Sequence, residues 1–419
     1  MNTLADIAVL DRRWGAVVAV AIVIAIGVIA MTPTLARLRR HRAVALVSSA
    51  GGVAIPIGVA LGPFGLGIVT DDVLADARPL VMIGLGWIGM IVGLQLRRDI
   101  IARVPRILWR WTIADALGCG AIAAAIGGLS TLFVDDTLSR TPGTMWLAIV
   151  LTGLVAIGWS PETRSLGLRL GAGAARVRVL VQAGSGLASL ITVAVLGVVA
   201  AMVSGSAHAP VDAASDALVA VAAAIGVAFG ARFLLAKVQR NAPEATLVLL
   251  GGLAFLSGAA DELGVPALFV GLLCGATLAN LGGAGLRDLE ENVRRAEPAL
   301  ATFFFVIAGT LIRPGHLVLT FAIAAALLAV RVLVKPAIAS STLGPDAPSL
   351  EREFPVRSLP LRQAPIVVPM LVGAVVATPH PALRSLLAAA VATGLVAAIL
   401  TFAAAVRPRR ADALGGVPA

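Results

Sequence analysis

Long apolar stretches, separated by short polar ones, run along almost the whole chain. A transmembrane helix needs about 20 mostly apolar residues, and about thirteen stretches approach or reach this length. The sequence therefore predicts an all-α polytopic membrane protein. The spans are expected to begin near Trp14, Ala43, Arg78, Arg106, Thr144, Arg176, Asp216, Ala245, Leu263, Pro298, His316, Leu359 and Pro381.

Composition supports a membrane protein and excludes several function classes. Of the 419 residues, 59% are hydrophobic and 13% are charged, whereas soluble chains carry about 25% charged residues. A soluble enzyme or a nucleic-acid binder is therefore excluded. Cys119 and Cys274 lie in apolar stretches and are interpreted as small packing residues. No cysteine or histidine spacing indicates a metal site, so neither a metal nor a cofactor is expected.

Basic residues predict the orientation of the spans. Lys and Arg outnumber Asp and Glu by 33 to 23, and they cluster behind every second span, as the positive-inside rule requires. This pattern predicts an outside amino terminus and a cytoplasmic carboxyl terminus, in a membrane expected to be the bacterial inner membrane. The arginine clusters could also contact anionic lipid headgroups.

The two halves of the chain share a weak internal similarity. A shift of seven spans reverses membrane orientation, so the halves are expected to be inverted repeats, an arrangement typical of secondary transporters. The repeats are expected to cover about residues 14–203 and 245–406, with a linker helix at about 215–238 and a cytoplasmic tail at 407–419. The matched positions pair Gly58 and Gly62 with Gly271 and Gly275, Gly93 with Gly309, Asp115 with Arg331 and Lys335, and Ser160-Pro161 with Ala364-Pro365.

Two stretches carry a resemblance to a known family. The run GVALGPFGLGIVTDDVLADARPLVMIGLGWIGMIVGLQLRRDI (58–100) resembles the monovalent cation:proton antiporters of the Kef and sodium/proton exchanger type, and LGVPALFVGLLCGATLAN is similar to the equivalent stretch in their second half. The resemblance covers roughly residues 16–405. It implies a thirteen-helix fold with a scaffold or dimerisation domain, a mobile core domain and two crossed broken helices. It also implies a homodimer that exchanges a monovalent cation for protons by alternating access.

Several residues match the family's functional positions. Ser160 and Pro161 match the Ser-Pro break of the first crossing helix, where proline frees backbone carbonyls. Lys335 resembles the family's membrane-embedded basic residue, and Arg331 lies one turn earlier on the same face. Gln363 and Pro365 stand at the entrance to the second crossing, where many relatives have Arg-Gly-Glu.

The acidic pair of the family is missing from the sixth span. That span reads ARVRVLVQAGSGLASLITVAV and offers Gln182 and Ser185 in the corresponding window. The chain therefore resembles a divergent member. The alternative is a repurposed or noncatalytic member that moves a neutral or organic solute or has a regulatory role, because serine and glutamine bind such solutes but carry no titrating charge. An intramembrane serine protease at Ser185 is disfavoured, since no histidine lies at membrane depth.

Asp115 lies about nine residues into the fourth span. An unpaired charge at that depth costs at least about 2.5–3.5 kcal/mol, so Asp115 is expected to be protonated, to face water, or to pair with Arg331 or Lys335. Two interpretations remain open. Asp115 is either a proton carrier and substitute ion ligand on the transport pathway, or one half of a salt bridge that joins the two repeats.

Overall fold

The computed structural model describes residues 51–102, 104, 106–134, 142–158, 174–204, 210–237, 242–282, 286–313, 317–343, 364 and 366–406, together with 18, 21–27 and 29. Within these ranges every regular element is helical and no strand occurs, which confirms the predicted all-α architecture.

The described helices extend from residue 54 to residue 406. In chain order they are α4 (Ala54–Leu61), α5 (Asp71–Asp76), α6 (Arg78–Leu94), α7 (Arg98–Ile101), α8 (Arg106–Val134), α10 (Pro142–Ile157), α12 (Ala174–Ser204), α13 (Pro210–Lys237), α14 (Ala242–Glu262), α15 (Ala267–Leu281), α16 (Leu286–Arg295), α17 (Glu297–Leu311), α18 (Leu317–Ala329), the π-helical turn η3 (Val330–Val334), α19 (Lys335–Leu343), α21 (Val367–Ala377) and α22 (Pro381–Val406).

Many of these helices have the length and composition of membrane spans. Among the described residues, five segments are long and apolar enough to cross a bilayer: Arg106–Ser130, Ala214–Leu235, Glu244–Glu262, Thr320–Thr342 and Pro381–Leu400. Further apolar helices of 10–17 residues accompany them. The protein is therefore an integral, multi-pass membrane protein, as the apolar pattern predicted. The predicted span at Trp14 is described only at residues 18, 21–27 and 29. The span predicted from Ala43 is described from residue 51 onward, where it contains α4.

One predicted span boundary differs in the structure. The ninth span begins at Ala267 rather than at Leu263, because Gly264 has a φ of 64° and Pro266 is extended, which breaks the chain between α14 and α15. The start of the twelfth span, expected at Leu359, lies outside the described residues, and the described helix α21 begins at Val367.

Short helices occupy several connections between the predicted spans. The clearest is α16, where Arg294 pairs with Glu290 and Arg295 pairs with Glu291, each one helical turn away. Such pairs stabilise a helix modestly. Membrane spans are predicted from about 20 consecutive apolar residues, and α16 has ten residues that are mostly charged. The apolar pattern therefore gave no indication of this helix.

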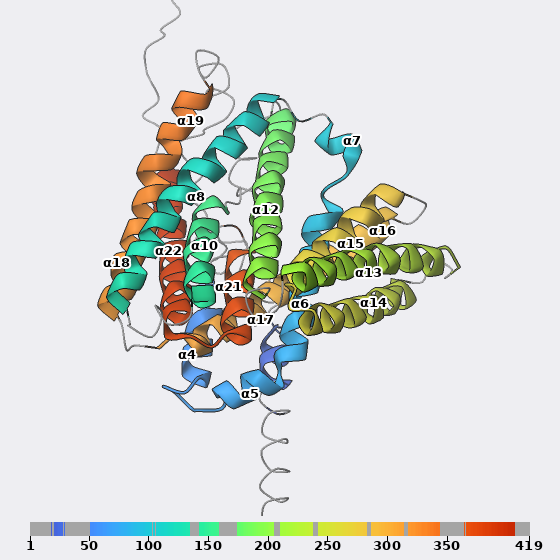
Figure 1. The fold of residues 1–419 in the computed structure, drawn as a ribbon, viewed down its shortest axis with the longest axis horizontal. Helices are drawn as coiled ribbons and strands as arrows, with labels where there is room; N and C mark the ends of the chain where they lie inside the picture. The colour runs from blue at the N-terminus through green and yellow to red at the C-terminus, as the bar shows by residue number, and fades with distance from the viewer. Residues whose placement is uncertain are drawn as a thin grey trace, which may run out of the picture.

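The helices form two groups (Figure 1). The scaffold group contains α4, α6, α13, α14, α15 and α17. The core group contains α8, α10, α12, α18, α19, α21 and α22. Most helices pack most extensively within their own group, but α17, which pairs with α4, packs on α21 and α22 more than on α6. The groups meet mainly where α12 and α21 approach α6, α13, α15 and α17. The boundary between the two groups therefore runs between α12 and α21 on one side and the scaffold helices on the other.

Glycines bring two pairs of helices into close contact within the scaffold group. A methyl group on Gly58 of α4 would lie 2.9 Å from the Cα of Gly309 in α17. A methyl group on Gly93 of α6 would lie 3.0 Å from the Cα of Gly275 in α15. The glycines matched in the sequence therefore allow the helix backbones to touch, as small residues do in membrane proteins.

We predict that Gly271→Ala destabilises the scaffold group. The added methyl would lie 2.9 Å from the Cα of Gly86. The backbone of α6 at Gly86 can move away from this methyl only if α6 separates from α15. Overpacking of this kind costs about 1–3 kcal/mol, measurable as a lower midpoint of thermal unfolding in detergent. Gly258→Ala in α14 is the matched control, because open space surrounds Gly258 and alanine is the better helix former. Equal midpoints for the two variants would contradict the packing argument.

Candidate functional site

The centre of the core group holds a buried ion pair. Asp115 of α8 and Lys335 at the start of α19 are both 1% exposed. The Lys335 Nζ donates a hydrogen bond to Asp115 Oδ2 at 2.5 Å. One turn after Asp115, the Cys119 thiol donates to Asp115 Oδ1 at 3.2 Å. Both carboxylate oxygens are therefore engaged by donors within the core.

A π-helical turn places the two basic side chains. The turn η3 interrupts the helix between α18 and α19 and includes Arg331, and Lys335 follows it directly. Turns of this type are frequent at functional sites because they change which side chains face the same way. Here Arg331, fully buried, and Lys335 both reach the end of α10.

The carboxyl end of α10 accepts these donors. Arg331 Nη2 donates to the carbonyl oxygens of Val155, at 2.5 Å, and Gly158, at 2.8 Å. Lys335 Nζ lies 3.4 Å from the carbonyl oxygen of Ile157. The last carbonyls of a helix lack partners within it and carry a partial negative charge. The two basic side chains therefore satisfy and neutralise a helix end inside the protein.

The end of α10 meets the start of α21 at Gly158. The backbone N–H of Ala364 donates to the carbonyl oxygen of Gly158 at 3.3 Å. A methyl group on Gly158 would lie 2.8 Å from the Val367 side chain, so only glycine fits at this approach. The end of α10 and the start of α21 are thus held together beside the Asp115–Lys335 pair.

The predicted site residues divide into three sets. Asp115, Arg331 and Lys335 lie together, and the partner of Asp115 is Lys335, whereas Arg331 binds the end of α10. Gln182 and Ser185 lie on α12, which packs against α8 and α10. The remaining four predicted residues fall outside the described residues: Ser160, Pro161, Gln363 and Pro365.

Sequence reasoning missed two contributors to this cluster. Cys119 was interpreted as an apolar packing residue, but it donates to Asp115; its spacing of four residues from Asp115 on one helix could have indicated the contact. The carbonyl oxygens of Val155 and Gly158 left no signal in the sequence, because backbone groups carry no residue identity.

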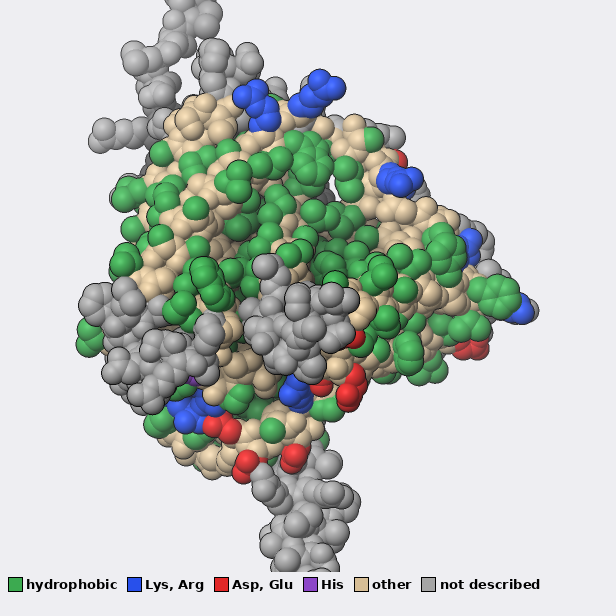
Figure 2. Space-filling view, viewed as in Figure 1, with side chains coloured by type: hydrophobic (Ala, Val, Ile, Leu, Met, Phe, Trp, Pro, Cys, Tyr) green, Lys and Arg blue, Asp and Glu red, His purple; other side chains and the backbone are tan. Residues whose placement is uncertain are grey.

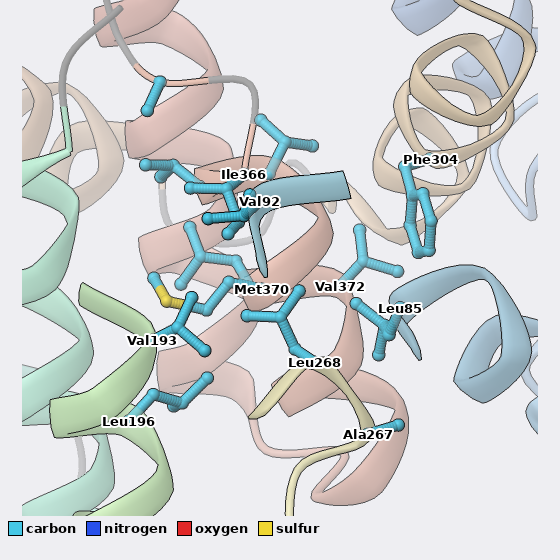
Figure 3. Packing of buried hydrophobic residues seen from close by; sticks show 14 of the residues in the cluster. Leu85, Val92, Val193, Leu196, Ala267, Leu268, Phe304, Ile366, Met370 and Val372 are labelled. Carbon is cyan, nitrogen blue, oxygen red and sulfur yellow. The ribbon is translucent and has the colours of Figure 1, made fainter. Parts of the chain in front are cut away.

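A cavity of about 220 Å³ lies on the boundary between the two groups. Its scaffold side comes from α6, α14 and α15 and its core side from α10, α12 and α21. Figure 3 shows Leu196, Leu268 and Met370, from three of these helices, close together in the apolar wall. Arg78 and Asp261 also line the cavity, and they form an ion pair with an Nη2 to Oδ1 distance of 2.7 Å.

Charged side chains are distributed unevenly between the two ends of the molecule. Figure 2 shows acidic side chains, with a few basic ones beside them, at the end that holds α5, and basic side chains at the opposite end. The cavity lies toward the α5 end, because its Arg78 begins α6 immediately after α5.

Comparison with known proteins gives matches in structure alone. No family model and no curated protein matches the sequence. The structure of the sodium proton antiporter MjNhaP1 from Methanocaldococcus jannaschii at pH 8 aligns with a TM-score of 0.65 and 16% identity, covering 93% of this chain and 98% of that one. An electron-microscopy structure of the same antiporter aligns with a TM-score of 0.57 and 16% identity, covering 83% of this chain and 88% of that one. The chain therefore has the fold of a sodium/proton antiporter.

Proposed function

We propose that the protein is a secondary transporter that exchanges a monovalent cation, Na⁺ or K⁺, for protons by alternating access, with Asp115 as the exchanging carboxylate. The observation that carries the proposal is a buried carboxylate beside the point where the end of α10 meets the start of α21, within an antiporter fold. A buried ionisable side chain in a membrane protein is costly and marks ion and proton pathways.

The chemistry requires that Asp115 and Lys335 change partners. A cation that reaches Asp115 replaces the Lys335 ammonium as its counter-charge, and the ammonium can then release its proton. One cation entering and one proton leaving keep the buried charge constant, which avoids the cost of an unpaired charge. Arg331 cannot take this part because guanidinium does not deprotonate in proteins, so it serves to hold the end of α10.

Alternating access is supported by the division into two groups. The site belongs entirely to the core group, while the cavity lies between core and scaffold. A shift of the core against the scaffold would expose the site to one side and then to the other.

The proposal includes a homodimer in the bacterial inner membrane with the α5 end outside. The uneven distribution of charged side chains between the two ends supports that orientation.

The test is proton flux in liposomes. The purified protein is reconstituted with a pH-sensitive dye inside, and gradients of Na⁺, K⁺ or Li⁺ are applied in turn, with choline as the cation that cannot fit. Proton flux driven by at least one small cation and absent with choline is the expected result. Flux no greater than in empty liposomes with all three cations would contradict the proposal.

A second candidate function is favoured by the cavity. Its walls are mainly apolar, and apolar walls do not replace the hydration shell of a small cation. A repurposed member of the fold that moves a neutral or organic solute, or has a regulatory role, would account for such walls and for Gln182 and Ser185 in place of an acidic pair. This candidate gains support only if no cation drives proton flux.

A further inference from the structure

A second charged cluster lies at the α5 end of the molecule, apart from the buried ion pair. Asp71, the first residue of α5, binds two arginines through the same carboxylate oxygen, Oδ2. Arg384 Nη2 lies 3.1 Å from this oxygen, and Arg313 also pairs with it. The Arg384 side chain is 12% exposed, although Asp71 is 47% exposed. The cluster is therefore anchored in the protein on its arginine side.

The two arginines belong to different helix groups. Arg313 follows the end of α17 in the scaffold group, and α5 packs on α6 of the same group. Arg384 lies in the first turn of α22 in the core group. The Asp71–Arg313 pair therefore stays within the scaffold, whereas the Asp71–Arg384 pair crosses from scaffold to core.

Local structure holds both partners of the crossing pair in place. The Thr70 side chain accepts a hydrogen bond from the backbone N–H of Val73 and caps α5. At the start of α22, His380 Nδ1 accepts from the backbone N–H of Ala382. Caps of this kind fix the first turn of a helix, so a shift of the core against the scaffold would separate Asp71 from Arg384.

Asp71 carries its charge at neutral pH. Its partial burial acts to raise the pKa of the carboxyl, but hydrogen bonds and charge from Arg384 and Arg313 outweigh burial and hold the pKa below its ordinary value.

We propose that Asp71 is a positioning residue whose pairing with Arg384 favours the arrangement seen in the structure, with the cavity between core and scaffold toward the α5 end. Separation of the pair accompanies the shift to the alternate arrangement. The inference rests on the alternating access of the proposed function, but its test measures the arrangement of the groups and not transport.

The test compares populations of the two arrangements in Asp71→Asn. Spin labels are placed on exposed residues of the two groups, through Leu247→Cys in α14 and Ser341→Cys in α19; the native Cys119 and Cys274 are buried. Distances between the labels are measured by pulsed electron paramagnetic resonance on the full chain in nanodiscs. Partly exposed ion pairs have modest energies, so we expect the population ratio to move about two- to fivefold toward the alternate arrangement.

Three comparisons make the result specific. Arg384→Gln should produce the same shift, and in the Asp71→Asn background it should add nothing. Arg313→Gln, the matched control within the scaffold, should leave the ratio unchanged. High salt should reduce the difference between the parent protein and Asp71→Asn, because exposed charges are screened. An unchanged ratio in both Asp71→Asn and Arg384→Gln, or an equal shift in Arg313→Gln, would overturn the proposal.

Discussion

Replacing Lys335 with methionine is expected to destabilise the protein by about 3–5 kcal/mol, because it removes one partner of a buried ion pair and leaves the other without compensation. Both side chains are excluded from solvent, so water cannot replace the lost ammonium at Asp115. The Cys119 thiol, which also donates to Asp115, is only a weak donor. The expected result is a large decrease in the midpoint of thermal unfolding, measured in detergent by intrinsic fluorescence of the tryptophans.

Two further variants separate loss of the pair from loss of packing. Lys335→Arg keeps the charge and should be less destabilised than Lys335→Met. The double variant Asp115→Asn with Lys335→Met removes both charges and should recover much of the lost stability, since replacing a whole buried pair by uncharged groups is often nearly neutral. A double variant as unstable as the sum of its single variants would mean that the two side chains act independently, contrary to the contact in the structure.

Much of the fold could be predicted from the sequence because membrane spans are long and their pattern is simple. The helices near Arg78, Arg106, Arg176 and Pro381 begin at or close to their expected positions. The starts of α15 and α21 were harder to predict from the sequence, since a few residues around Gly264 and Ala364 decide where each helix begins. The short charged helix α16 has no long apolar stretch by which a span could be predicted.

The candidate site could be predicted only in part. The depth of Asp115 and the matching depth of Arg331 and Lys335 indicated that a buried carboxylate needs a buried cation. Whether Arg331 or Lys335 would pair with Asp115 depended on the π-helical turn η3, which determines where the two basic side chains point. Arg331 instead donates to backbone carbonyls at the end of α10. Neither a helix defect nor a free carbonyl has a residue type, so periodicity and resemblance could not reveal them.

The central claim is that exchange passes through Asp115, and Asp115→Asn tests it while changing the shape of the side chain very little. The amide keeps an oxygen for Lys335 but loses the negative charge, so it cannot bind a cation in place of the Lys335 ammonium, and the proton on Lys335 is not released in exchange. Asp76→Asn, an exposed position of α5, is the matched control for removal of one carboxylate. Both variants are checked for folding by their elution and unfolding midpoint before reconstitution.

The decisive measurement is the cation-driven proton flux of Asp115→Asn in the liposome assay, relative to the parent protein and Asp76→Asn. We predict that Asp115→Asn falls to the level of empty liposomes and that Asp76→Asn retains the flux of the parent. Flux in Asp115→Asn equal to that of the parent would contradict the claim that this carboxylate exchanges the cation and the proton.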